Sequence, residues 1–218
     1  MDSFVAFLDI LGTTEKVRRG EFSDLELLDF ANPVGSVAHC NPAFRFAVFS
    51  DSVILSCETD HARDFVSVLS FLYSQWFSDH ILVRGGVSVG EVRWVDDSNT
   101  DDLFRRLKNF MYARVYGKAL VAAIQLEERS GPGAICYVDE RASRLLSKED
   151  ENFILQGQTD ALIWADDKGI EYWLDVTSLY LSYTGEGTEL RRHLRATVEY
   201  YKRVKESGKA LQDEFALS

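Results

Sequence analysis

The chain has 218 residues, of which 46% are hydrophobic and 27% charged, a composition typical of one soluble globular domain with a sizeable core. Its 35 acidic residues outnumber 24 basic ones, and the net charge of −11 argues against an electrostatic nucleic-acid binder and against docking on an anionic membrane. The three cysteines are widely spaced, which argues against a disulfide framework and favours the cytoplasm. The four histidines are scattered, which argues against a zinc site. The sequence has no run of roughly 18 to 20 apolar residues, which argues against a membrane span.

The N-terminal part of the chain predicts a strand, a turn and a helix. Residues 4–8 form an apolar run that stops at Asp9, which is typical of a buried strand entering a tight turn. Ser23 and Glu26 have the spacing of a capping box and predict a helix. We expect Pro33 to end this helix, because proline removes a helical hydrogen bond.

The next segment predicts a β-hairpin, a long helix and a strand. Two runs of β-forming residues, 44–49 and 53–56, flank Asp51 and predict a hairpin with an acid at its tip. Apolar residues then recur every three or four positions over residues 62–76, which indicates an amphipathic helix. Residues 81–95 predict a glycine-rich strand, and glycines inside a strand indicate the close approach of another group.

After an acidic loop at 96–102, the remainder of the chain predicts both helices and strands. Further helices are expected at 103–110, 117–129 and 139–146, and from residue 189 onward. Further strands are expected at 134–138, 153–156, 161–164 and 170–176. This order predicts a single α+β domain over residues 1–218, with one sheet and helices on one side of it.

Two acids are conspicuous because their flanks are apolar. Asp9 follows the run FVAFL, and Asp51 lies between AVF and VIL. If the first strand and the hairpin are neighbours in one sheet, both carboxylates emerge at the same end and repel each other. A divalent cation such as Mg²⁺ or Mn²⁺ removes that conflict, since both ions prefer oxygen ligands. The alternative is that each acid only caps a turn.

The turn after Asp9 has features of a phosphate site. It offers a backbone carbonyl at Ile10 and a run of backbone N–H groups near a helix start, which suits a polyphosphate. The sequence contains no Walker A motif, so a phosphate site here needs acids and a metal ion. The candidate substrate-binding residues of this turn are Ile10, Leu11, Gly12, Thr13 and Thr14.

Four motifs together resemble a known family, the nucleotidyl cyclase catalytic domains that include mammalian-type adenylate and guanylate cyclases. The motifs are D-I-x-G-x-T at 9–14, SDS at 50–52, RGGVSVG at 84–90 and YGKALVAAIQLE at 116–127. The resemblance covers roughly residues 4–138 and implies a ferredoxin-like α+β catalytic domain with a central, mostly antiparallel sheet that residues 139–218 complete.

The resemblance also implies an activity, its metal ions and a partner. In this family the 3′-hydroxyl of a nucleoside triphosphate attacks its own α-phosphate and pyrophosphate leaves, which makes the enzymes phosphorus–oxygen lyases. Two divalent ions, Mn²⁺ or Mg²⁺, are implied at Asp9, Asp51 and the Ile10 carbonyl. A homodimer with its sites at the subunit interface is implied as well.

The chain departs from the family pattern at its catalytic helix and at its purine-reading positions. Val121 and Gln125 stand where the family has a transition-state asparagine and arginine. The lysine that reads a purine is replaced by Ala47, and its paired acid falls near Tyr112. Phe49 and Tyr112 place bulk where a base would lie, although such aromatics are often ordinary core or interface residues.

Other cations must then face the phosphates. The candidates for this role are Lys118, Arg84 and Arg114, with Lys118 and Arg84 assigned to catalysis and Arg114 to substrate binding. The alternative for each is a solvated surface charge or a salt bridge.

The loss of the purine readers on a short chain resembles the pyrimidine cyclases of bacterial anti-phage signalling, called Pycsar. This resemblance implies a uridylate or cytidylate cyclase, with UTP preferred over CTP, whose product cUMP or cCMP activates a separate effector. Three alternatives remain open: a purine cyclase, a nucleotide-binding domain without turnover, and a plain interaction domain.

Overall fold

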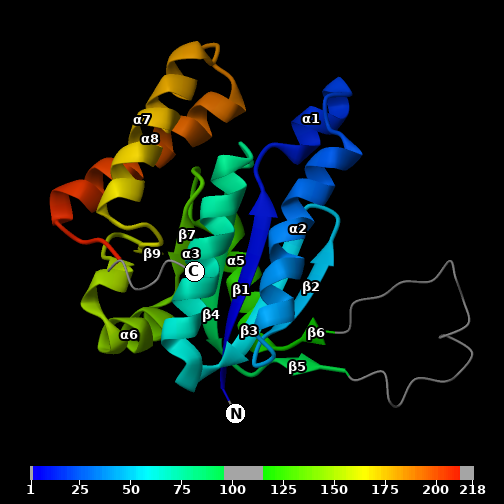
Figure 1. The fold of residues 1–218 in the computed structure, drawn as a ribbon, viewed down its shortest axis with the longest axis vertical. Coiled ribbons are helices and arrows are strands. Elements are labelled where there is room, and N and C mark those ends of the chain that lie inside the picture. The colour runs from blue at the N-terminus through cyan, green and yellow to red at the C-terminus, as the bar shows by residue number, and fades with distance from the viewer. Residues whose placement is uncertain (1, 96–114, 212–218) are drawn as a thin grey trace, which may run out of the picture.

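The computed structural model describes residues 2–95 and 115–211, and its α+β fold is built on one large sheet (Figure 1). Within these residues seven strands lie in the order β2-β3-β1-β4-β7-β9-β8. The strands are β1 (Ser3–Ile10), β2 (Arg45–Phe49), β3 (Ser52–Glu58), β4 (Val83–Gly90), β7 (Cys136–Val138), β8 (Ile154–Leu155) and β9 (Asp160–Leu162). A separate two-stranded sheet pairs β5 (Arg93–Trp94) with β6 (Val115–Tyr116).

Helices connect and cover these strands. They are α1 (Thr13–Arg19), α2 (Asp24–Cys40), α3 (Ala62–Ser78), α5 (Lys118–Arg129), α6 (Glu140–Glu149), α7 (Asp167–Tyr183) and α8 (Glu189–Ser207), with short 3₁₀ turns η1 (Thr59–His61) and η3 (Glu151–Phe153). Among the described residues, no helix combines the length and apolar character needed to cross a membrane.

The first half of the chain has ferredoxin-like topology. Strand β1 lies between β3 and β4 and is antiparallel to both, and β2 pairs with β3 as a hairpin. The chain order β1-α2-β2-β3-α3-β4 with the sheet order β2-β3-β1-β4 is the split βαβ arrangement. The predicted fold class is therefore confirmed. Strand β7 joins β4 in parallel, and β9 and β8 extend the sheet beyond it.

Helices cover both faces of the sheet, so the prediction of helices on one side was wrong. Phe4 and Leu8 of β1 pack into the main core with α2 and α3, which lie side by side in front of the sheet in Figure 1. Val5 points the other way and packs against Ala119 and Ala123 of α5. Because β1 is central and buried on both faces, its sequence is almost continuously apolar and shows no alternation that would reveal a second covered face.

The glycines of β4 allow α5 to lie directly on the sheet. A Cβ atom built on Gly86 would lie 2.1 Å from the carbonyl oxygen of Ala123. Ser88, two residues further on, donates a 2.6 Å hydrogen bond from its Oγ to the carbonyl of Ala119. The close approach that glycines in this strand indicated is thus the approach of the α5 backbone.

The helix α2 runs through the proline that was expected to end it. Ser23 caps its start as predicted, with its Oγ accepting a 3.3 Å hydrogen bond from the N–H of Glu26. The helix then continues to Cys40 with Pro33 inside it. Phe30 and Val34 are almost fully buried on either side of the proline. Burial of such side chains contributes roughly 1.5–3 kcal/mol each, which offsets the ~3 kcal/mol penalty of a helical proline.

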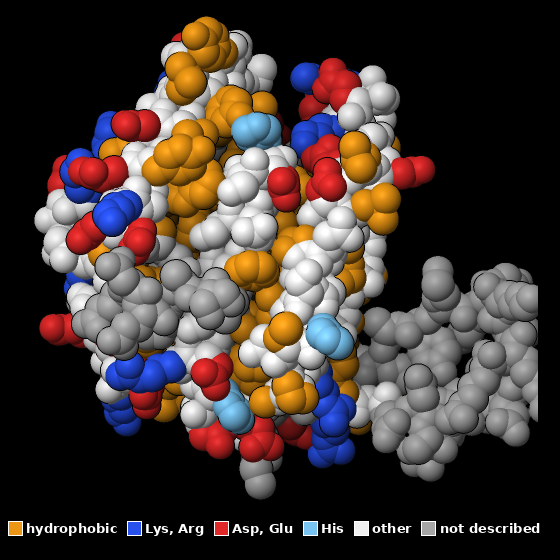
Figure 2. All heavy atoms as spheres, in the orientation of Figure 1, with side chains coloured by type: hydrophobic (Ala, Val, Ile, Leu, Met, Phe, Trp, Pro, Cys, Tyr) orange, Lys and Arg blue, Asp and Glu red, His pale blue; other side chains and the backbone are white. Residues whose placement is uncertain are grey.

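The strand expected at residues 170–176 is also wrong, because these residues belong to α7. Asp166 caps this helix by accepting a 2.6 Å hydrogen bond from the N–H of Gly169. Ile170, Trp173 and Thr177 are buried with helical spacing. Helices α7 and α8 pack together as a pair at the upper left of Figure 1. A groove separates this pair from α1 at the top of the space-filling view (Figure 2), and hydrophobic side chains gather beside it.

The three cysteines are free and differ in their surroundings. Cys40 is exposed at the end of α2, whereas Cys57 and Cys136 are buried. Burial raises the pKa of the Cys136 thiol to about 12, and burial also raises the pKa of Cys57. Both buried thiols are therefore fully protonated at neutral pH and unreactive.

Candidate functional site

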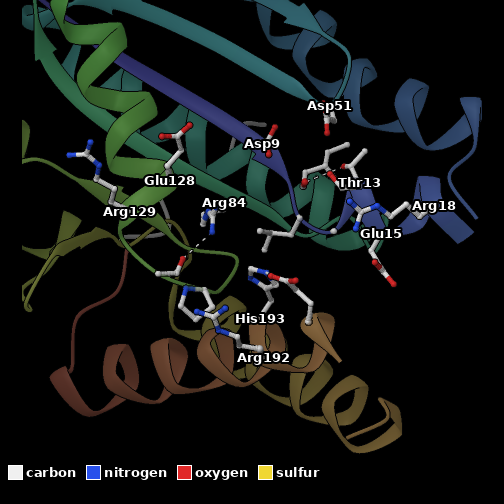
Figure 3. A pocket seen from close by; sticks show the side chains of 17 residues that line it. Asp9, Thr13, Glu15, Arg18, Asp51, Arg84, Glu128, Arg129, Arg192 and His193 are labelled. Carbon is white, nitrogen blue, oxygen red and sulfur yellow. Dashed lines mark hydrogen bonds and ion pairs between the residues drawn. The ribbon is translucent and has the colours of Figure 1, made fainter. Parts of the chain in front are cut away.

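A cavity of about 500 Å³ lies where β1 ends, and the two conspicuous acids line it. Asp9, Asp51 and Arg84 contribute to its walls, together with the turn that follows Asp9 (Figure 3). Residues from α1, from the end of α5 and from the start of α8 complete the lining. The sheet thus brings three segments that are far apart in the sequence to one opening.

Strand register holds the two acids together. Asp9 is paired with Ser52 across the β1–β3 ladder, and the Oγ of Ser52 donates a 2.6 Å hydrogen bond to Asp9 Oδ1. The N–H of Ile10 donates a 3.0 Å hydrogen bond to the carbonyl of Asp51. The prediction that both carboxylates lie at the same end of the sheet is confirmed by this pairing.

The Asp9 carboxyl is held in a poorly solvated position. Its pKa is raised to about 6, chiefly by burial. The negative charges of Asp51 and Glu127 act in the same direction, whereas the Ser52 hydrogen bond and Arg84 oppose the shift. An ionised Asp9 therefore destabilises the metal-free chain at neutral pH. This is the arrangement that a bound cation would stabilise.

The variant Asp9→Asn is expected to melt at a higher temperature than the wild type at about pH 8 in the presence of EDTA, and at nearly the same temperature at about pH 4. Between the ordinary pKa of 3.8 and the folded pKa of about 6, the folded chain keeps a proton that the unfolded chain has lost. Stability is consequently lost as the pH rises through this window and does not return above it. Thermal melts across the range check this, and a difference independent of pH would contradict it.

The turn after Asp9 has the backbone conformation that its glycine predicts. Gly12 has φ of +82°, in the left-handed region, and its carbonyl accepts the first helical hydrogen bond of α1, 3.0 Å from the N–H of Lys16. The Oγ1 of Thr13 donates a 3.2 Å hydrogen bond to the carbonyl of Ile10. All five predicted residues of this turn line the cavity: Ile10, Leu11, Gly12, Thr13 and Thr14.

Arg84 lines the cavity but is already bound to a buried acid. It is paired with Asp9 in the β1–β4 register, and its Nε donates a 2.5 Å hydrogen bond to Oε1 of Glu127. Its Nη1 also donates to the carbonyl of Gly131 at 3.1 Å. Burial raises the pKa of Glu127, and Arg84 opposes that shift. Much of the guanidinium charge is therefore neutralised by Glu127, which the sequence analysis did not anticipate.

Other predicted site residues are not brought to this cavity. Lys118 begins α5, whereas Glu128 near the other end of that helix lines the cavity; ten residues of helix separate them by about 15 Å. Lys118 therefore lies away from this cavity in its own chain, and its expected catalytic role stays a prediction. Phe49 ends β2 with 41% of its surface exposed and does not line the cavity either. Tyr112 and Arg114 lie outside the described residues.

The structure adds lining residues that sequence reasoning missed. Arg18 comes from α1, Arg129 from the end of α5, and Arg192 and His193 from the start of α8. The Nδ1 of His193 accepts a 3.0 Å hydrogen bond from the N–H of Gly133, and burial lowers the pKa of this histidine. No motif marks these residues in the sequence.

The donor set of the cavity fits hard divalent cations. Two carboxylates and the Ile10 carbonyl offer oxygen ligands only, which suits Mg²⁺ or Mn²⁺ with further ligands from water and phosphate. The part of the chain that the structure describes holds no cluster of three or more His, Cys, Asp or Glu side chains placed for a metal ion. A site at Asp9 and Asp51 would thus be an open one, completed by substrate.

Comparison with known proteins places the fold. No protein-family model matches the sequence, and a search of curated proteins finds no match. The chain is similar in structure to a bacterial light-regulated adenylyl cyclase, with 14% identity and a TM-score of 0.51 over 74% of this chain and 88% of that one. It is also similar to adenylate cyclases from Trypanosoma brucei in their monomeric state, with 12% identity and a TM-score of 0.51 over 74% and 87%. At these identities the likeness establishes the fold.

Proposed function

We propose that this chain is a metal-dependent nucleotidyl cyclase that converts a pyrimidine nucleoside triphosphate, UTP rather than CTP, to its 3′,5′-cyclic monophosphate. The observation that carries the proposal is the convergence of Asp9 and Asp51 on one cavity, in a fold that adenylyl cyclases share. In the reaction, the 3′-oxygen bonds to the α-phosphorus as its proton is released, and the bond from that phosphorus to the leaving pyrophosphate oxygen breaks.

The residues of the cavity would have different roles in the reaction. Asp9, Asp51 and the Ile10 carbonyl would hold two divalent ions, which when bound favour ionisation of the 3′-hydroxyl and neutralise phosphate charge. Ser52 fixes the orientation of the Asp9 carboxylate through its 2.6 Å hydrogen bond. The turn after Asp9 would carry the phosphates, and Arg84 would lie beside them with Glu127 holding its guanidinium in place.

Two copies of the chain would complete each site. Val121 and Gln125 lie on the exposed side of α5 and cannot take the charge-stabilising roles that the family resemblance assigns to these positions. Lys118 lies on the same exposed side and would serve the cavity of a second copy. The resemblance and this placement both support a homodimer.

The preference for a pyrimidine rests on the positions that would read a base. Ala47, on β2, stands where a purine-reading lysine is expected, and its methyl group donates no hydrogen bond. Phe49, at the end of the same strand, is a partly exposed aromatic residue next to the hairpin turn. A signalling role in anti-phage defence, with a separate effector that responds to the cyclic nucleotide, follows from the Pycsar resemblance alone.

The full chain incubated with Mn²⁺ and each of the four ribonucleoside triphosphates is expected to form cyclic UMP in greatest yield. Mass spectrometry identifies each product, and a coupled assay measures the pyrophosphate released with it. Cyclic AMP or cyclic GMP as the main product would replace the pyrimidine assignment by a purine one. Asp175→Asn is a matched control for variants of the two cavity acids, because Asp175 is an exposed acid on α7 that lines no described cavity. It should form cyclic product as the wild type does.

A second candidate, a domain that binds nucleotide without turnover, is favoured by Val121, which lies with 53% of its surface exposed where an asparagine is expected. The same experiment separates the two. Tight binding of a nucleoside triphosphate with no pyrophosphate release would support the second candidate. Retention of two mutually repelling carboxylates argues against a domain that binds nucleotide without divalent ions, because such a domain gains nothing from them.

A further inference from the structure

Three arginines line the cavity without a partner of their own. Within the described residues, Arg18, Arg129 and Arg192 form no ion pair and no side-chain hydrogen bond, while Arg84 is bound to Glu127. Exposed arginines without an ion pair also occur elsewhere in the described residues, as at Arg45 and Arg195, but these three are distinguished by lining the same cavity as Asp9 and Asp51. Unpaired guanidinium groups around one opening indicate an anionic ligand.

The three arginines do not face the cavity equally. Figure 3 shows Arg18 reaching from α1 beside Thr13, and Arg192 lying on α8 across the cavity from Asp51. The same view shows the guanidinium of Arg129 directed away from Asp9. Arg18 and Arg192 are therefore the two unpaired cations that a ligand held near Asp9 and Asp51 would meet.

Buried hydrogen bonds fix the position of the start of helix α8, which carries Arg192. The His193 Nδ1 accepts a 3.0 Å hydrogen bond from the N–H of Gly133, and Thr197 Oγ1 accepts one of 2.9 Å from the N–H of Ala134. Both side chains are buried, so the start of α8 is tied to the loop that carries Gly131, the acceptor for Arg84. Arg192 is thus presented by a fixed element, although its own side chain is exposed.

We propose that Arg18 and Arg192 bind the terminal phosphates of the nucleoside triphosphate, so that α1 and α8 hold the tail whose α-phosphate lies near Asp9 and Asp51. This inference rests on the proposed function and gives the C-terminal helix α8 a direct part in substrate binding. A guanidinium can hold two phosphate oxygens at once, which a solvated lysine does less well. Both arginines would contact the tail before and during the reaction, so they would chiefly govern substrate affinity.

Inorganic tripolyphosphate with Mn²⁺ tests the inference without a base or a chemical step. We expect Arg18→Gln and Arg192→Gln each to weaken its binding to the full chain, measured by calorimetry, by about tenfold or more, the effect of losing one charge-assisted contact. Arg195→Gln is the matched control. This exposed arginine lies three residues after Arg192 on α8 and does not line the cavity. With UTP, both variants should raise KM by a similar factor while kcat changes less than about threefold.

The outcomes distinguish the inference from the proposed function. If both arginine variants bind tripolyphosphate and UTP as Arg195→Gln does, the inference is wrong even where cyclic product still forms. Absence of tripolyphosphate binding by the wild type would overturn it as well. Binding that the two variants weaken, with no cyclic product from any nucleotide, would support the inference and reject cyclase activity. Melting temperatures equal to that of Arg195→Gln show that a weakened variant is folded, and Arg192→Lys should recover part of the affinity.

Discussion

Replacement of Asp51 by asparagine is expected to lower the rate of cyclic nucleotide formation by about a thousandfold or more, the scale seen when a preorganised charge is removed from a reaction centre. The carboxylate of Asp51 lies with that of Asp9 at the cavity, and the pair supplies the negative charge that would hold two divalent ions. Asparagine has the same shape and no charge. The backbone carbonyl of residue 51 still accepts the hydrogen bond from Ile10, so the hairpin is kept.

The fold of this variant should be intact. We expect Asp51→Asn to melt within a few degrees of the wild type in EDTA, because removing one of two neighbouring carboxylates relieves repulsion. Asp175→Asn, assayed beside it, controls for the general effect of losing one acid. Wild-type turnover by Asp51→Asn would end the assignment of a two-ion site. If the variant instead loses both turnover and folding, the stabilities of Asp9→Asn and Asp51→Asn are compared.

Replacement of Gly86 by alanine is expected to destabilise the chain by about 3 kcal/mol or more, the upper range for overpacking a rigid contact. The new Cβ would lie 2.1 Å from the Ala123 carbonyl oxygen and 2.8 Å from the backbone nitrogen of Glu127, so α5 would have to move off the sheet. Such a loss corresponds to a melting temperature lower by about 10 °C for a chain of this size. Movement of α5 would also displace Glu127 from Arg84.

Gly90→Ala is the matched control for this substitution. Both glycines belong to β4, but a Cβ on Gly90 meets only Ala119, at an ordinary 3.6 Å from its Cβ and 3.9 Å from its backbone nitrogen. We expect its melting temperature to stay within about 3 °C of the wild type, since no atom has to move. Equal stability of Gly86→Ala and Gly90→Ala, measured by thermal and urea unfolding, would show that the contact between β4 and α5 is looser than described.

The parts of the fold that could be predicted from the sequence are those encoded locally. The hairpin around Asp51 was predictable because two β-forming runs flank a short polar turn, and β2 and β3 pair there as expected. The Ser23 cap and the apolar stripe of α3 follow equally simple patterns. Each signal lies within a few residues of the element that it specifies.

The errors arose where tertiary packing outweighs local preference. The segment from Ile170 to Val176 is rich in aromatic and β-branched residues and therefore predicts a strand, but the Asp166 cap and burial of Trp173 favour a helix. Pro33 lies within a helix whose neighbouring apolar residues are buried in the core. Placement of α5 on the second face of the sheet depends on Gly86, whose partner is nearly 40 residues away in the chain.

The candidate site was predictable only in its acidic half. Asp9 and Asp51 are marked by apolar flanks, and strand pairing brings them together. Arg18 and Arg192 lie on helices whose polar faces have the composition of any solvated surface. Only the folding of α8 against the 131–134 loop brings Arg192 to the cavity, through contacts between residues some 60 positions apart.

The distribution of thiols makes the native chain suitable for labelling at one position. A maleimide dye should react at Cys40, the exposed cysteine, and leave the two buried cysteines unmodified. Two batches carrying donor and acceptor dyes could then report subunit exchange by energy transfer, without any engineered residue. Because Cys40 ends α2 and does not line the cavity, the dye would leave Asp9 and Asp51 chemically untouched.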